Sequence, residues 1–195
     1  MKPDTSSEIG AESFAATGLH WTASQVRKIL REAGWLGEES PAPASQDPAR
    51  AALDAWLEQA AALLGPHAAS PQALIELLRL IFRYDARSVV EDQENQAVIM
   101  RSGAREVIRE LANRVFGGGE IDSDRFKEII EGIKSAVPYR SRALFQPIRV
   151  ALAGRAGEGE LDRVILLLDG AAKIPFAVKV KATRQRMLEF CAALD

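Results

Sequence analysis

Apolar residues recur at intervals of three and four along most of this chain, a pattern that predicts amphipathic helices. The clearest stripe consists of five residues: Leu74, Leu77, Leu78, Ile81 and Phe82. Ser70 and Pro71 precede it, a capping side chain followed by a proline in the first helical turn. No segment combines a two-residue period with flanking turn residues, and only residues 176–180 are ambiguous. We therefore predict an all-α protein, a multi-helix bundle of roughly eight helices.

Start and stop signals place the other helices. Thr22 and Gln25 predict a capping box at the start of the first helix, and Gly34 predicts its end. Asp47 and Pro48 predict the start of the second. Further helices are expected over about 102–116, 123–137, 158–168 and 180–194, the last with Met187, Leu188, Phe190 and Leu194 inward. A short helix is expected to begin at Pro147 and end at Gly154.

Composition divides the chain into four regions. Residues 1–20 are polar and aperiodic, which predicts a flexible tail, and residues 21–36 form the N-terminal helix. Residues 37–47 hold three acidic residues and two prolines, which is typical of a linker. Residues 48–195 then form the helical domain. The acidic stretch of Glu91, Asp92 and Glu94 either separates lobes or turns a corner, and two lobes are expected, about 48–120 and 121–195.

The net charge of −2 conceals an asymmetry. The segment from Lys134 to Leu188 holds eleven Lys or Arg against four Asp or Glu, whereas the residues before it are acidic overall. A chain polarised in this way can present a cationic face to a polyanion. The alternative is that these charges only solvate helix faces.

The residue inventory argues against several classes of function. A single cysteine, Cys191, excludes an internal disulfide, and with only His20 and His67 beside it a Cys/His zinc site has too few ligands. No histidine lies in a nucleophile motif, so we expect no catalytic residues, no metal and no cofactor. No apolar run reaches the roughly 18 residues of a membrane span, and the N-terminus is unlike a secretory signal. We expect a cytoplasmic, non-enzymatic protein without a membrane partner.

The most informative segment is Tyr139–Gly154, in which basic residues lead into an apolar pair and then a proline. If Pro147 starts a helix, Arg149 projects outward from its first turn. An isolated guanidinium among aliphatic residues is costly unless it meets an anion or a planar base. The alternative is an internal salt bridge with Glu158 or Glu160.

The order of residues in this segment resembles a family motif. It runs Leu144-Phe145-x-Pro147-Ile148-Arg149-Val150-Ala151-Leu152-x-Gly154, and Leu161 and the run Ile165–Gly170 follow. The C-terminal anticodon-binding region of bacterial glutamyl-tRNA synthetases carries a similar Leu-Phe-x-Pro-Leu-Arg-x-Ala-Leu-Thr-Gly segment before a helix ending in Leu-Leu-Gly. The resemblance covers about residues 70–170, roughly half of the chain, including Phe82-Arg83-Tyr84-Asp85 upstream.

This resemblance implies an all-helical cage that reads the anticodon of glutamate tRNA. In such a domain Arg149 would contact an anticodon base and Leu161 would lie against the splayed bases, while Arg140, Arg142 and Arg155 would hold phosphates. Single-stranded RNA loops are read by contacts of these kinds.

The chain also departs from the family pattern. Ala153 replaces the threonine before the glycine, Gly157-Glu158 replaces Gly-Pro, and Arg140-Ser141-Arg142 replaces Lys-Gly-Lys. The Rossmann-type sheet and nucleotide motifs of a class I synthetase have no counterpart in this sequence.

Three readings of function remain at this stage. The first is a freestanding, non-catalytic module that binds tRNA or another structured RNA. The second is a helical protein–protein interaction module that has lost RNA reading, which the carboxylates Glu158 and Glu160 favour. The third is a degenerate fragment without selected activity.

Overall fold

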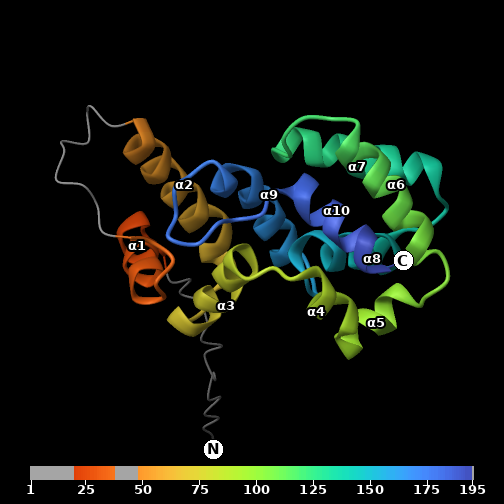
Figure 1. The fold of residues 1–195 in the computed structure, drawn as a ribbon, viewed down its shortest axis with the longest axis horizontal. Coiled ribbons are helices and arrows are strands. Elements are labelled where there is room, and N and C mark those ends of the chain that lie inside the picture. The colour runs from red at the N-terminus through yellow and green to blue at the C-terminus, as the bar shows by residue number, and fades with distance from the viewer. Residues whose placement is uncertain (1–19, 38–47, 195) are drawn as a thin grey trace, which may run out of the picture.

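Only helices and loops occur in the described part of the chain, residues 20–37 and 48–194 of the computed structural model (Figure 1). The all-α prediction is confirmed, and residues 176–180 form no strand. Within these ranges there are ten α-helices and one 3₁₀ turn: α1 Ala23–Glu32, α2 Pro48–Leu64, η2 Gly65–His67, α3 Pro71–Phe82, α4 Ala86–Glu91, α5 Gln93–Ile99, α6 Ala104–Phe116, α7 Ser123–Ala136, α8 Ser141–Ala153, α9 Glu160–Ala172 and α10 Thr183–Leu194.

The predicted starts of α1, α3 and α7 are confirmed. Thr22 and Gln25 form the reciprocal capping box of α1. The hydroxyl of Ser70 accepts a hydrogen bond from Ala73 N at 3.1 Å, and Asp122 caps α7 in the same way. The predicted tail and linker, together with Asp47, lie outside the described residues apart from His20 and Gly37.

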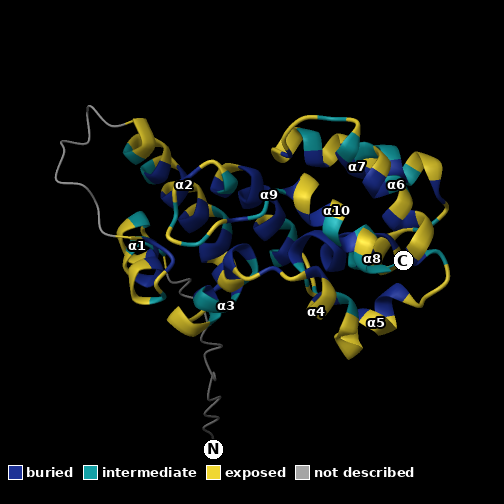
Figure 2. Ribbon diagram, in the orientation of Figure 1, coloured by how far each residue is buried: buried dark blue, intermediate teal, exposed yellow. Residues whose placement is uncertain are grey.

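Helix α9 runs through the middle of the molecule and connects its two sides. It packs on α2 and α3 on one side and on α8 on the other (Figure 1). Its apolar side chains are almost all buried: Leu161, Val164, Ile165, Leu166, Leu167 and Leu168 (Figure 2). Fully burying one aliphatic side chain contributes about 1.5–3 kcal/mol, so this helix supplies a large share of the core.

Aromatic side chains fasten α1 and the segment after it to the core. Trp35 stacks on Phe82 with ring centroids 4.8 Å apart. The indole N–H of Trp56 donates to Leu167 O at 3.1 Å, and that of Trp21 donates to Ala68 O at 2.8 Å. The indoles of Trp21 and Trp56 are therefore both packed and hydrogen-bonded.

Helices α4 and α5 were not predicted. They are only six and seven residues long, too short to show a helical period. Their starts are marked by acids that cap them: Asp85 accepts from Ser88 N at 2.9 Å, and Asp92 accepts from Asn95 N at 3.0 Å. Within the acidic stretch Asp92 is thus a helix cap at the corner between α4 and α5.

Two further expectations are wrong. Helix α8 begins at Ser141, so Pro147 lies inside it and does not start it. Leu188 is 62% exposed, because α10 turns that position away from the face that buries Met187 and Phe190.

Two buried charged side chains, those of Asp169 and Arg186, hold helix α10 in the core. The first is the buried carboxylate of Asp169, which accepts hydrogen bonds from Thr183 N at 2.8 Å and Ile121 N at 2.7 Å. The second is Arg186.

The guanidinium of Arg186 is fully buried and lies over the ring of Tyr84, 4.5 Å from its centroid. It donates to three backbone carbonyls, those of Ile81 (2.6 Å), Leu152 (2.8 Å) and Lys181 (3.0 Å). The first two belong to the last turns of α3 and α8, so one side chain joins three helices.

Candidate nucleic-acid interface

Residues 154–159 form the loop between α8 and α9, called here the α8–α9 loop. Gly154 ends α8 in the left-handed region, with φ of +86°, and its N–H donates back to Arg149 O and Val150 O at 3.1 Å. An added Cβ at this position would meet Tyr84 and Val89 side-chain atoms at 3.3 Å. Glycine is therefore required both for backbone conformation and for close packing.

The buried side chain of Asn95 fixes the start of the loop. Its amide nitrogen donates to Val89 O at 3.0 Å and Gly154 O at 3.2 Å, and its oxygen accepts from Ala156 N at 2.8 Å. These bonds join α5 to both ends of the turn that carries Arg155. The turn is therefore preorganised.

Arg149 faces inward, and the expectation that it projects outward is wrong. Its Nε and Nη2 donate to the two carboxylate oxygens of Asp162, each at 2.8 Å, and its Nη1 donates to Gly157 O at 2.9 Å. The ring of Phe145 lies 5.2 Å away. Although burial opposes the charged form, the hydrogen bonds and charge of Asp162 raise the pKa of Arg149 above its ordinary value. Through its bond to Gly157 O, Arg149 thus holds the α8–α9 loop in place from the buried side.

The partner of Arg149 also differs from the expected ones. Glu158 lies at 4.0 Å, at the limit of an ion pair, whereas Asp162 makes the bidentate contact. Asp162 stands in the first turn of α9, which packs against α8, so the two side chains meet across that interface.

Leu161 is fully buried beneath the loop. A Cβ on Gly157 would come within 2.6 Å of its Cδ1 atom, which shows how closely the loop covers it. A side chain in this position offers no surface to a nucleobase, so its contact to the loop is structural.

The three arginines expected to hold phosphates are all exposed but differ in their partners. Arg140 donates to Val137 O at 2.8 Å and Tyr139 O at 2.7 Å, and Arg142 pairs with Glu158 at 2.7 Å. Arg155 makes no hydrogen bond or ion pair with any described residue. Five residues were expected to bind RNA. Four of them lie in the α8–α9 loop or contact it: Arg142, Arg149, Arg155 and Leu161. Arg140 does not contact the loop.

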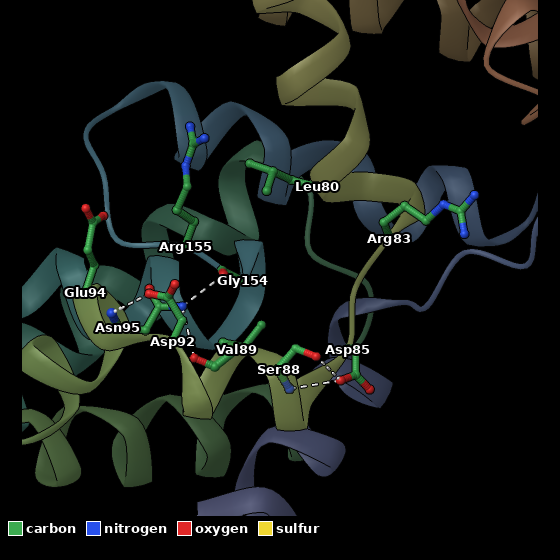
Figure 3. A pocket seen from close by; sticks show the side chains of 10 residues that line it. All are labelled: Leu80, Arg83, Asp85, Ser88, Val89, Asp92, Glu94, Asn95, Gly154 and Arg155. Carbon is green, nitrogen blue, oxygen red and sulfur yellow. Dashed lines mark hydrogen bonds between the residues drawn. The ribbon is translucent and has the colours of Figure 1, made fainter.

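Sequence reasoning missed Arg83, which lies at the end of α3 and whose guanidinium has no partner in the described ranges. Arg83 and Arg155 line the same pocket, of about 380 Å³, beside the α8–α9 loop (Figure 3). The segment Phe82–Asp85 was part of the family resemblance, which is the signal that could have identified it.

Metal sites and membrane-spanning helices each have structural requirements, with which the described residues can be compared. They contain no cluster of three or more His, Cys, Asp or Glu placed to hold a metal ion. No helix found among them is both long and apolar enough to cross a bilayer. His67 is exposed in η2, and Cys191 is half-buried on α10.

Comparison with known proteins gives one family and a group of relatives. A family model described as "Anticodon binding domain" matches residues 15–169. Glutamate–tRNA ligase of Bacillus thuringiensis (strain Al Hakam) is 27% identical over 114 residues, which are 58% of this chain and 23% of the ligase. Glutamate–tRNA ligase 1 of Halorhodospira halophila is 33% identical over 79 residues, 40% of this chain and 16% of that protein.

The chain thus spans less than a quarter of the length of these curated relatives. A search of the solved structures found no match. Helix α10 lies beyond the matched residues.

Proposed function

Since this chain belongs to the anticodon-binding domain family, we propose that it is a non-catalytic module that binds tRNA with the surface around the α8–α9 loop. The observation that carries the proposal is Arg155, an exposed and unpaired guanidinium on a loop that Asn95 and Arg149 hold rigid. Cations of this kind bind phosphates with release of counterions. The relatives are named as ligases of glutamate and tRNA, which supports tRNA as the partner.

The arginines have different roles in this proposal. Arg155 contacts phosphate directly, and Arg142 does so in competition with Glu158, which now neutralises it. Arg140 extends the same surface at the start of α8. Arg149 and Leu161 act as positioning residues, because reaching a base would require Arg149 to leave Asp162.

A filter-binding titration against total tRNA at two salt concentrations tests the proposal. Affinity should fall steeply with salt, and Arg155→Ala should weaken binding and reduce the slope of log affinity against log salt by about one. Arg109→Ala is the matched control, since Arg109 is exposed on α6 and lines no part of the loop. A salt-independent signal, or equal losses in both variants, would contradict the proposal.

A second candidate is a protein-docking module. Two of the arginines near the loop, Arg142 and Arg149, are already neutralised by carboxylates. Met100 is 77% exposed at the turn before α6, and an exposed methionine suits an adaptable protein contact. A stable protein complex that forms through Met100, without measurable tRNA binding, would favour this function.

A further inference from the structure

Helices α6 and α10 pack side by side, and both expose side chains next to their contact (Figure 2). At the end of α6, Arg184 of α10 donates to Phe116 O at 2.9 Å and lies over the Phe116 ring, 5.7 Å from its centroid. The other N–H groups of this guanidinium have no described partner. Four exposed residues of the two helices form what is called here the α6–α10 surface: Arg105, Arg109, Arg184 and Leu188.

The arginines of α6 lie on the helix face that leads to α10. Arg105 and Arg109 are one turn apart, and Phe116 follows Arg109 at i+7, so the three side chains share one face. Neither arginine makes a hydrogen bond or an ion pair with a described residue. Like charges at this spacing destabilise a helix, so the pair gains nothing for the fold.

The acids of α6 leave these arginines uncompensated. Glu106, Glu110 and Arg114 follow one another at four-residue spacing on a different flank of the helix. Glu110 pairs with Arg114 at 3.8 Å, and Arg114 donates to Gly132 O of α7 at 2.8 Å, so this flank faces α7. The cationic flank toward α10 is therefore left to meet an external anion.

Leu188 adds an apolar side chain to the surface. It follows Arg184 by one turn of α10 and is 62% exposed. The neighbouring acid does not neutralise Arg184, because Glu189 pairs with Lys181 at 2.6 Å. Helix α10 lies beyond the residues that the family model matches. The α6–α10 surface therefore exists only because the chain continues past the matched region.

We propose that the α6–α10 surface binds an acidic protein segment that carries an apolar side chain among its carboxylates. Guanidinium groups form bidentate hydrogen bonds with carboxylates, and Arg184 is already oriented by its contacts with Phe116. The apolar side chain of the partner covers Leu188. This leucine favours a protein over RNA, since a phosphate backbone presents no apolar side chain. The surface shares no residue with the α8–α9 loop, so the inference goes beyond the proposed function and does not depend on it.

Fluorescence anisotropy with two fluorescein-labelled peptides tests the proposal on the full chain. Both peptides are rich in glutamate, and leucine recurs at helical spacing in the first, where the second carries serine. The leucine peptide should bind about fivefold more tightly than the serine peptide, because only leucine buries apolar surface against Leu188. Affinity for both should fall with added salt.

Arg109→Ala and Leu188→Ser are the test variants, and Arg155→Ala is the matched control. Arg109→Ala should weaken the binding of both peptides about threefold, as expected for one exposed ion pair. Leu188→Ser should remove the preference for the leucine peptide and leave the affinity for the serine peptide unchanged. Arg155 is equally exposed but lies on the α8–α9 loop, so its removal should change neither affinity.

The same variants are titrated with total tRNA to separate the two proposals. No binding of either peptide, equal affinity for the two, or equal losses in Arg109→Ala and Arg155→Ala would overturn the acidic-segment proposal. Loss of tRNA affinity in Arg109→Ala would overturn it as well and assign the surface to RNA. Peptide binding without tRNA binding would instead overturn the proposed function alone. Thermal melts verify that the variants keep the fold.

Discussion

Arg149 and Arg186 are both buried, yet their guanidinium groups are stabilised in different ways. Arg149 makes a bidentate contact with Asp162. Arg186 instead donates to three backbone carbonyls and lies over a tyrosine ring, and no carboxylate of the described residues is within hydrogen-bond contact of it. Their pKa values move in opposite directions: Asp162 raises that of Arg149, while burial lowers that of Arg186 to about 10. A buried cation therefore needs acceptors, and a counter-ion is one way among several to provide them.

The position of each arginine explains its partners. Ile81 and Leu152 lie in the last turns of α3 and α8, where carbonyls lack helical donors and carry the negative end of the helix dipole. Arg186 satisfies these groups deep in the core. Arg149 lies near the surface, where the first turn of α9 brings an acid within reach.

The largest effect is expected for Arg186→Ala. This change leaves three buried carbonyls without a donor and opens a cavity, and should lower the free energy of unfolding by about 4 kcal/mol. Urea denaturation measures it. Arg184→Ala, on the exposed side of α10, should cost about 1 kcal/mol or less. Similar losses in the two variants would show that the carbonyl contacts contribute little.

Asp162→Asn should have the next largest effect. It leaves the Arg149 charge buried without its main partner, at a cost of about 2 kcal/mol once the partial exposure of Asp162 is taken into account. The double variant Arg149→Met/Asp162→Asn should be more stable than the sum of the single losses predicts. Strict additivity in this double-mutant cycle would argue against a direct pair.

Tyr84→Phe should cost about 1 kcal/mol at neutral pH, because the phenol donates to Ala151 O at 2.7 Å. Burial raises the pKa of Tyr84 above its ordinary value of 10. Above pH 10 the unfolded chain releases this proton while the folded protein keeps it, so the stability contributed by Tyr84 falls as pH rises. The variant should therefore lose less stability than the parent between pH 9 and 11, by up to about 1.4 kcal/mol per pH unit above 10. The free energy of unfolding of both proteins, measured by urea denaturation at several pH values, checks this. Parallel plots of that free energy against pH would contradict it.

The smallest effect on stability is expected for Glu158→Gln. The Arg142–Glu158 pair is exposed, and such pairs contribute about 0–1 kcal/mol. Releasing Arg142 should nevertheless raise tRNA affinity about threefold and steepen its salt dependence. Unchanged affinity would place Arg142 outside the RNA-binding surface.

Much of the fold could be predicted from sequence because its signals are local. The capping box of Thr22 and Gln25, the Ser70-Pro71 start and the apolar stripe of α3 each depend on residues within a few turns. The resemblance to the anticodon-binding region of glutamyl-tRNA synthetases is likewise confirmed, since it rests on a contiguous motif. The lobe boundaries stay a prediction.

The site was less predictable because its contacts join distant positions. The pairing of Arg149 with Asp162 depends on how α8 packs on α9, and the interior position of Pro147 in α8 changes where Arg149 points. Arg186 looks in sequence like one more surface cation. Its burial depends on α3 and α8 ending at the same point in space.

The link from Arg186 to the ends of α3 and α8 also bears on the order of folding. Ile81 and Leu152 are synthesised before Arg186, so until α10 has been added their carbonyls can bond only to water or to other donors. Only when α10 arrives can a single side chain replace that water and close the interior. Completion of this part of the core therefore depends on α10, which follows α3 and α8 in the sequence.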